Sequence, residues 1–466
     1  MQTRRCHYVL STHWDREWYQ TFQDFRYRLV QLIDRVLAGW EDGRLKGPLQ
    51  TDGQVIVLDD YLEIRPEKRA EIEQAVQSGQ IVAGPWYVLP DEFLVSGESL
   101  IRNLRMGRKI VRSYGGMPSE GGFVCDLFGH NSQLPQILAG AGIRVAVFRR
   151  GLSEEPLEVW WDAPDGTRVL ALYLREGYDN LQWVPTDSDA FVAAVERQIE
   201  RLAPHSRSGH LLLLNGTDHM PPQRELPSLI RAANARLMGR ASIKHGTLPQ
   251  YAEAVQQALG PYGDLPVVRG ELRSPRRHHL LPGVLSARMW IKQRNHACEN
   301  LLERWVEPFT TWAELQTRGA NAFTPPTSPQ TTSRIDDPGS VVHQAWKLLL
   351  SNHPHDSICG CSIDATHDDM ISRFDQVDQI GEELTRQSLD ALQVAINTAS
   401  SGEHGEFAAL TVFNASPYRH SGIINASVDL PSGAQSLQVV DADGKPIAAD
   451  YFFREREFVE SNVYLI

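Results

Sequence analysis

The chain has 466 residues and a formal net charge of −12, so it is too long for a single ordinary core and too acidic for a nucleic-acid surface. Five cysteines without framework spacing and a polar N-terminus predict a reducing, cytoplasmic location, and no run is apolar enough to span a membrane. We therefore expect a protein of two or three domains that acts on a small polar molecule. We expect no nucleic-acid or membrane partner, and assembly into a homo-oligomer is left open.

Short apolar runs alternate with helical patterns along residues 1–265. Amphipathic helices are indicated after Phe25, Pro66 and Ser96, and Ser96 is a typical N-cap. Strands are expected at residues 6–10, 54–58, 81–83, 122–125, 145–148, 169–173 and 210–214. Strands alternating with helices predict an α/β domain whose parallel sheet is covered on both faces, as in a barrel or barrel-like fold.

The alternation of strand and helix patterns ends after residue 265. Residues 266–400 predict a linker and a helical bundle, and Pro308 should kink or split the first bundle helix. Helices are expected at 285–317, 341–350 and 368–396, with a loop at 318–338. Residues 401–466 contain short β-type runs, at 409–413 and 437–440, and a hairpin turn ending at Gly444. Because the chain stops inside such a run, we expect the start of a β-sandwich and an N-terminal part of a longer protein.

Acidic and histidine side chains follow several expected strands. His13 and Asp15 come just after the first strand and, two residues apart, face the same side of an extended chain. Asp126 directly follows the fourth strand, and Asp218 follows the seventh. In alternating strand–helix chains the catalytic groups lie where strands lead into the following loops. Between them, Asp126 and the segments at His13–Asp15 and His355 can offer two imidazoles and two carboxylates, which suit a zinc site with an open position.

Each of these residues also has an ordinary structural interpretation. Asp126 could be a helix N-cap, Asp218 could close a turn before two prolines, and His355 with Asp356 could begin a helix. A His-x-Asp pair alone is common by chance. The convergence of several such motifs at one end of the expected strands favours the functional interpretation.

Three longer segments resemble the signatures of glycoside hydrolase family 38, the zinc-dependent retaining α-mannosidases. Residues 13–18 read His-Trp-Asp-Arg-Glu-Trp, residues 126–132 read Asp-Leu-Phe-Gly-His-Asn-Ser, and residues 353–360 read His-Pro-His-Asp-Ser-Ile-Cys-Gly. Residues 84–98 are most similar to the bacterial branch, which includes mannosylglycerate hydrolases. The resemblance runs through the chain in the same order.

The resemblance implies a seven-stranded α/β barrel, a three-helix bundle and then β-sandwich domains. It also implies one Zn²⁺ per chain, held by His13, Asp15, Asp126 and His355. Asp126 would be the nucleophile as well, and Asp218 the acid/base residue, in the retaining exo-hydrolysis of a small or oligosaccharide α-mannoside. The sugar site would be lined by five further residues: Trp18, Phe128, Arg150 (or Arg149), Tyr178 and Asp356.

The chemistry of glycoside cleavage agrees with these roles, since retention needs a carboxylate nucleophile and a second carboxyl group that protonates the leaving oxygen. Two other classes stay open. One is a metal-dependent deacetylase or amidohydrolase, in which an aspartate acts as a base. The other is a carbohydrate-binding protein without catalysis, which would need no acid/base residue. An anionic aglycone would need a basic neighbour, for which the linker offers Arg273, Arg276 and Arg277.

Overall fold

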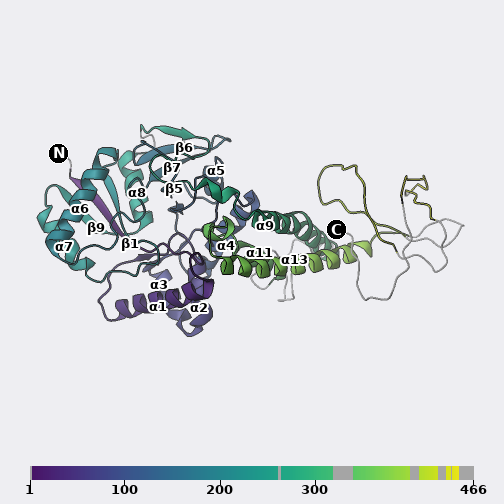
Figure 1. The fold of residues 1–466 in the computed structure, drawn as a ribbon, viewed down its shortest axis with the longest axis horizontal. Coiled ribbons are helices and arrows are strands. Elements are labelled where there is room, and N and C mark those ends of the chain that lie inside the picture. Colours follow the sequence, from purple (N-terminus) through teal and green to yellow (C-terminus); the bar gives the residue numbers. More distant parts are fainter. Residues whose placement is uncertain are drawn as a thin grey trace. The chain divides into compact units, whose positions relative to one another are not determined.

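The computed structural model describes residues 3–260, 264–318, 340–398, 409–428, 437–441 and 443–450 (Figure 1). The chain divides into two compact units, one made of residues 1–300 with 344–378 and the other of residues 301–343 with 379–466. All residues of the candidate site belong to the first unit. Of the helices in the described ranges, none combines the length and apolar content that a membrane crossing requires. The expected domain limits at residues 265 and 400 stay predictions.

A parallel sheet forms the first half of the α/β part. Its strand order is β3-β2-β1-β8, with β9 also paired to β1, and every pairing is parallel. β1 is central because it pairs with three neighbours along its length. The strands are β1 (Arg4–Ser11), β2 (Leu49–Gln50), β3 (Ile81–Val82), β8 (His210–Asn215) and β9 (Ala241–His245).

A second sheet has the order β10-β6-β7-β5-β4 and is parallel except for the antiparallel pair β6–β7. Its strands are β4 (Phe123–Val124), β5 (Val145–Phe148), β6 (Glu158–Asp162), β7 (Arg168–Tyr173) and β10 (Val267–Arg269). Within the described residues no strand pairing joins the two sheets into a closed ring. The α/β class with a parallel sheet is therefore confirmed, whereas the expected seven-stranded barrel is not.

One expected strand is wrong. Residues 54–58 lead into the helix α2 (Ile56–Ile64), and the strand of this region is the two-residue β2, five residues earlier. Short apolar runs do not distinguish a buried strand from the start of a buried helix, and Ile56, Val57 and Leu58 are all buried on α2. The strands β6, β9 and β10 were not expected at all.

Helices cover the sheets, and several begin where the sequence signals a cap. Thr21 caps α1 in a reciprocal capping box with Asp24, and the Ser96 side chain accepts a hydrogen bond from the Ser99 backbone N–H at the start of α4. The helices of this part are α1 (Phe22–Glu41), α2, α3 (Arg69–Gln77), α4 (Gly97–Ser113), α5 (Leu134–Gly140), α6 (Ser188–Leu202), α7 (Leu226–Arg236) and α8 (Leu248–Leu259), with 3₁₀ turns at Pro66–Lys68 and Ala203–His205.

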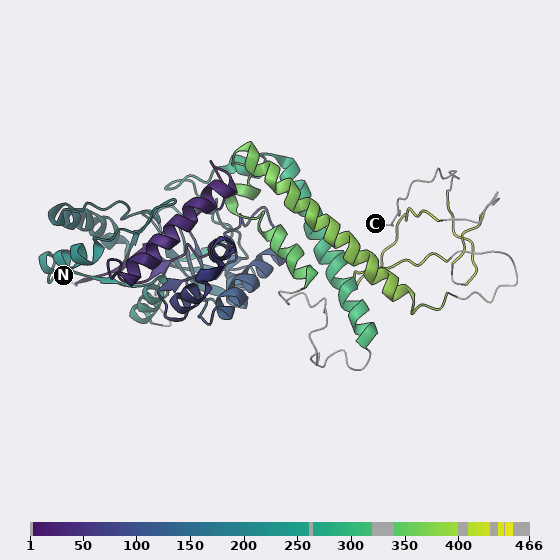
Figure 2. The ribbon, with the colours of Figure 1, turned by 90° about the horizontal axis from the view of Figure 1, so that it is seen from below.

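Further helices follow the sheets: α9 (Met289–Leu301), α10 (Glu307–Arg318), α11 (Val341–Leu350), α12 (His355–Ile358) and α13 (Asp364–Gln393). A 3₁₀ turn, Pro282–Leu285, precedes α9. A π-helical turn, Leu302–Val306, separates α9 from α10 just before Pro308, so the expected interruption is present. In Figures 1 and 2 α9 and α13 run side by side, and Arg294 of α9 pairs with Asp375 of α13 at 2.7 Å.

The C-terminal predictions have mixed outcomes. The expected loop at 318–338 lies almost wholly outside the described residues. Residues 409–413 are described but form no strand. The hairpin turn is present, because the Gly444 N–H donates to the Asp441 carbonyl at 3.0 Å and Val440 forms an isolated bridge with Pro446. The β-sandwich itself stays a prediction.

Candidate metal centre and active site

Strand pairing brings three of the expected site residues to one edge of the α/β part. The parallel pairing of β1 with β8 continues past both strands as a bridge between His13 and Asp218, in which the His13 N–H donates to the Thr217 carbonyl at 3.1 Å. Asp126 follows β4 after one residue. These residues therefore occupy the carboxyl ends of their strands, where parallel α/β proteins place their sites.

His355 reaches this edge from far along the sequence, as the first residue of α12. Its backbone N–H donates to the Leu89 carbonyl at 2.9 Å, and Pro354 bridges to Pro90. The buried Glu17 accepts from the Ser357 hydroxyl at 2.7 Å and from the Arg373 guanidinium at 2.8 Å. These contacts fix α12 against the loop that follows β1.

Four ligand-type atoms converge between these segments. Asp15 Oδ1 lies 3.0 Å from His13 Nε2 and 3.4 Å from His355 Nε2. Asp126 Oδ2 lies 3.8 Å from His13 Nε2 and 3.9 Å from His355 Nε2. Two ligands of a tetrahedral ion at bond lengths of ~2.0–2.1 Å are roughly 3.3–3.4 Å apart. The observed separations bracket that value.

Three of these four atoms lack hydrogen bonds. Among the described residues, His13 Nε2, Asp15 Oδ1 and His355 Nε2 are buried and make none, although they face each other at contact distance. Unpaired buried polar atoms are costly and rare in native proteins, so a cluster of three needs a partner that the polypeptide does not supply. Two imidazole nitrogens and two carboxylate oxygens therefore fit a divalent ion of the zinc type.

The electrostatics of the cluster favour a cation. Burial alone would lower the pKa of His13, but the carboxylates of Asp52 and Asp15 raise it well above its ordinary value. Burial would also lower the pKa of His355, but the carboxylates of Asp356 and Asp15 outweigh burial and raise this pKa to about 9. Burial tends to raise the pKa of Asp15, yet His13 and His355 hold it well below its ordinary range. The chain thus concentrates negative charge around two imidazoles.

Asp52 orients His13, and sequence reasoning missed it. Its Oδ2 lies 2.7 Å from His13 Nδ1 and accepts the Trp14 N–H at 3.0 Å. A carboxylate on the second imidazole nitrogen fixes the ring and its tautomer in metal sites. Asp52 has a φ of 55°, and Gly53 follows at 73°, so two consecutive left-handed residues turn the carboxylate toward His13. The signal was a Thr-Asp-Gly turn directly after β2.

Two arginines hold the expected nucleophile. Arg150 Nη2 donates to Asp126 Oδ1 at 2.5 Å, and Arg149 Nη1 donates to the same oxygen at 3.1 Å. Asp126 Oδ2 is the oxygen that faces the histidines. One carboxylate therefore divides its two oxygens between an arginine pair and the metal cluster, and both arginines considered in the sequence reach it.

Tyr178 links the cluster to the expected acid/base residue. Its hydroxyl donates to Asp218 Oδ1 at 2.9 Å, and its ring centroid lies 5.0 Å from that of His13. Burial raises the pKa of Tyr178, so the phenol stays a hydrogen-bond donor. Asp218 is half-buried, which leaves it accessible to a ligand in the site.

The other expected sugar-binding residues divide into two groups. Phe128 packs edge-on against the His355 ring at 5.7 Å, and Asp356 Oδ2 lies 3.8 Å from His355 Nε2, so both adjoin the cluster. Trp18 is half-buried and its indole contacts Tyr19 at 4.9 Å; no described ring contact joins it to the cluster. Its place in a sugar site stays a prediction.

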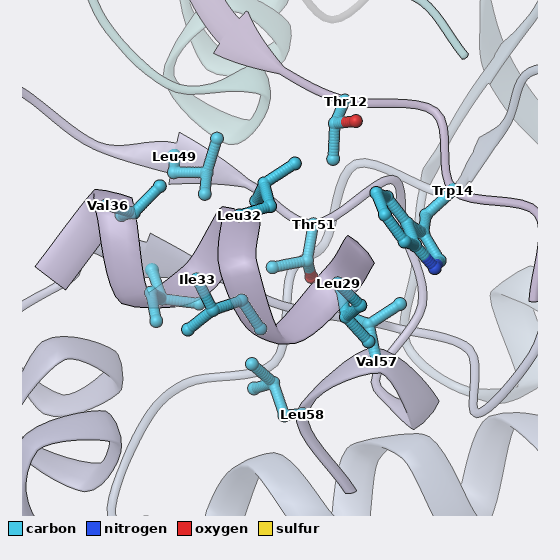
Figure 3. Close-up of a pocket in the computed structure, with 11 residues that line it drawn as sticks. Thr12, Trp14, Leu29, Leu32, Ile33, Val36, Leu49, Thr51, Val57 and Leu58 are labelled. Atoms are coloured by element: carbon cyan, nitrogen blue, oxygen red, sulfur yellow. The ribbon is translucent and has the colours of Figure 1, made fainter. Parts of the chain in front are cut away.

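The enclosed cavity in Figure 3 lies elsewhere. It is bounded by apolar side chains of α1 and neighbouring residues, among them Leu29, Leu32 and Trp14. Its volume of about 20 Å³ would hold one water at most, and it has no ionisable lining residue. It is a packing defect behind the sheet and not a binding site.

Comparison with known proteins yields matches along most of the chain. The family model for the glycosyl hydrolases family 38 N-terminal domain matches residues 4–271, and the alpha mannosidase middle domain matches residues 279–392. A relative from Halalkalibacterium halodurans, named as a candidate mannosylglycerate hydrolase, is 36% identical over 419 residues, or 86% of this chain and 44% of the relative. Alpha-mannosidase 2C1 of Homo sapiens is 26% identical over 80% of this chain and 33% of its own.

Two solved structures are also similar to this chain. An alpha-mannosidase from Enterococcus faecalis V583 superposes with a TM-score of 0.77 at 34% identity, covering 86% of this chain and 44% of that one. A second family 38 protein from Enterococcus faecalis gives a TM-score of 0.69 at 31% identity, with 86% of this chain and 42% of that chain covered. The chain spans less than half the length of these relatives.

Proposed function

Because this chain belongs to the glycosyl hydrolases of family 38, we propose that it forms the catalytic part of a zinc-dependent retaining exo-α-mannosidase. The observation that carries the proposal is the position of Asp126, one oxygen of which faces the His13–Asp15–His355 cluster while the other is held by Arg149 and Arg150. A carboxylate fixed at both oxygens is suited to attack one defined atom of a substrate.

His13, Asp15, Asp126 and His355 would hold one Zn²⁺ per chain. Zinc in such a site acts as a Lewis acid and a template for two neighbouring hydroxyl oxygens of the sugar. The polypeptide's part is to keep the four ligand atoms converged, which Asp52 does for His13 and the Leu89 carbonyl does for the backbone of His355. Asp356 and Phe128, next to His355, would contact the sugar.

The two carboxyl groups would have separate roles. Asp126, held by two guanidinium groups, would attack the anomeric carbon and form a glycosyl–enzyme bond. Asp218 would give its proton to the leaving oxygen and then take one from the water that releases the sugar. Tyr178, hydrogen-bonded to Asp218 Oδ1, would keep that carboxyl group oriented, with its other oxygen toward the substrate.

The decisive experiment compares leaving groups in Asp218→Ala. We expect this variant to lose most activity on alkyl α-mannosides and far less on activated aryl α-mannosides, because an activated group leaves without a proton. Added azide should restore turnover by intercepting the glycosyl–enzyme and should give the α-azide. A β-azide would contradict retention, and equal losses on both substrate classes would contradict the role of Asp218.

The same assay separates the rival classes. A deacetylase would release acetate from acetylated sugars and leave glycosidic bonds intact, with no glycosyl–enzyme to trap. A binding protein would retain affinity for mannosides without turnover. In both cases the proposed function would be wrong, whatever the metal content.

A further inference from the structure

Two cysteines follow α12 directly, next to the candidate site. Cys359 ends the helix and is buried, whereas Cys361 is exposed. Gly360 between them has a φ of 81°, a left-handed conformation that favours glycine, and a Cβ there would lie 3.2 Å from the Ala287 carbonyl oxygen. Arg288 Nε donates to the Gly360 carbonyl at 3.1 Å. The polypeptide itself therefore fixes the turn that carries both thiols.

Oxygen atoms of Asp356 lie next to the two thiols. Cys361 Sγ is 3.1 Å from Asp356 Oδ1 and 3.8 Å from the Asp356 carbonyl oxygen. Cys359 Sγ is 3.6 Å from the same carbonyl oxygen. One ligand atom from each of the three side chains lies within 4.8 Å of the others. Two ligands of a tetrahedral ion, at least one of them sulfur, are roughly 3.5–3.8 Å apart at zinc-type bond lengths. Small side-chain shifts would therefore let these atoms hold one ion.

The charges and the exposure also suit a metal cation. Two thiolates and one carboxylate around a dication leave one negative charge. The ammonium group of Lys292 can neutralise it, because Lys292 Nζ donates to the Cys359 carbonyl at 2.7 Å. Thiolate ligands select thiophilic ions over Mg²⁺ and Ca²⁺. Cys361 is exposed, so an ion can enter from solvent on its side.

We propose that Cys359, Cys361 and Asp356 form a second site, for a thiophilic divalent cation such as Zn²⁺ or Cd²⁺, separate from the four-ligand cluster. Each thiol would release its proton to solvent as the ion binds. Asp356 adjoins both sites, because its Oδ1 faces Cys361 while its Oδ2 lies 3.8 Å from His355 Nε2.

An ion on the two thiols would hold a carboxylate that is expected to contact the sugar. Binding at the second site should therefore inhibit the proposed hydrolysis. This consequence rests on the proposed function, whereas metal binding by the thiols does not.

The test adds Cd²⁺ to the zinc-loaded protein, with a phosphine reductant to keep the thiols reduced. The wild type should take up about one further metal ion per chain and gain the ultraviolet charge-transfer absorption of a cadmium–thiolate bond. Cys361→Ser and Cys359→Ala should lose both signals, because each removes a sulfur ligand. Cys298→Ser is the matched control and should keep both. Its thiol lies 3.4 Å from Asp378 Oδ1, but no second thiol joins it among the described residues.

A His13→Ala variant separates the two sites. It should lose the zinc of the four-ligand cluster and still gain the cadmium–thiolate absorption, because both thiols remain. Elemental analysis would count the ions, and melting temperatures would verify that each variant is folded. Absence of the absorption in the wild type, or its full retention in Cys361→Ser, would overturn the proposal. Its loss in folded His13→Ala would also overturn it, since the thiols would then not form a separate site.

Inhibition tests the consequence for catalysis. Cd²⁺ should inhibit hydrolysis of an aryl α-mannoside by the wild type, and a chelator weak enough to leave the zinc bound should restore the rate. Cys361→Ser should stay active at the same Cd²⁺ concentrations. Equal inhibition of both proteins would contradict the coupling through Asp356. No turnover by the wild type without Cd²⁺ would contradict the proposed function, while the absorption titration would still decide the metal site.

Discussion

Two histidine pairs, one in β1 and β8 and the other beyond the carboxyl end of β1, have opposite electrostatic surroundings. In the first half of β1, His7 Nε2 lies 2.7 Å from Nδ1 of His210, the first residue of β8, and burial followed by His210 and Lys244 lowers the pKa of His7 to about 4. Beyond the other end of β1, His13 stacks on His355 with ring centroids 5.4 Å apart, and both have raised pKa values.

Burial acts in the same direction on all four rings, so burial does not explain the difference. The carboxylates do: Asp52, Asp15 and Asp356 surround the second pair, whereas the groups that act on His7 and His210 are cationic or histidine. The carboxylates around His13 and His355 therefore give that pair the negative surroundings that favour a cation, which His7 and His210 lack.

The largest effect should come from removing the carboxylate that belongs to both the metal cluster and the arginine pair. Asp126→Ala should lower kcat/KM on every α-mannoside by about 10⁴-fold or more, because it removes the carboxylate proposed to form the glycosyl–enzyme. His7→Gln, in the other histidine pair, is the matched control and should keep full activity at neutral pH. Substantial turnover by Asp126→Ala in steady-state assays would exclude it as the nucleophile.

Metal content should separate the two histidine pairs directly. Purified wild-type protein should contain about one zinc per chain, whereas His13→Ala and His355→Ala should each lose most of it, since two of four ligands are imidazoles. His7→Gln should retain it. Elemental analysis after dialysis against a weak chelator measures this, and full occupancy in His13→Ala would show that the metal lies elsewhere.

Removing the carboxylate behind His13 should have a smaller effect. Asp52→Asn keeps the side-chain volume but removes the charge next to His13 Nδ1. Loss of such a supporting partner weakens metal binding by about 10–100-fold. Competition with a chelator of known affinity would measure the change, with the exposed Asp165→Asn as control. An unchanged zinc affinity would mean that Asp52 has no part in orienting the imidazole.

The smallest effect is on acid stability and comes from the pair without carboxylates. As the pH falls below 6.5, the ordinary pKa of histidine, the unfolded chain binds a proton before the folded His7 does at about 4. The contribution of His7 to the free energy of unfolding is therefore fully present above pH 6.5 and is lost as the pH falls toward 4. At pH 5 the loss should be about 1–2 kcal/mol. Urea unfolding should show a shallower pH dependence in His7→Gln than in the wild type or in His420→Gln, whose histidine is exposed. An equal pH dependence of the unfolding free energy in His7→Gln and the wild type would contradict this role of His7.

Much of the candidate site could be predicted from local patterns, because strand ends mark positions. His13, Asp15, Asp126 and Asp218 each lie two to four residues past the end of a strand, and parallel strands gather their carboxyl ends. His355 could be included only through its resemblance to a known motif. Nothing in its neighbourhood indicates that α12 binds the loop at Leu89, 266 residues earlier.

Asp52 and the sheet topology were missed for identifiable physical reasons. β2 has two residues, too few to show any alternation, and the apolar run after it belongs to α2. A sheet closes into a barrel only when its edge strands pair with each other. The residue pattern within one strand does not show which strand it pairs with. β6, which was not expected, pairs antiparallel with β7.

The distribution of the ligands along the chain has a consequence for synthesis. Glu17, which anchors α12, emerges from the ribosome 340 residues before Ser357, its hydrogen-bond partner. At ~5–20 residues per second, the segment after β1 would wait roughly 20–70 s for His355. During that interval His13 and Asp15 would offer only part of the proposed ligand set to a metal in the surroundings. A nascent chain halted before residue 355 should therefore exchange zinc freely, and ligand capture should become slow to reverse only once α12 has docked.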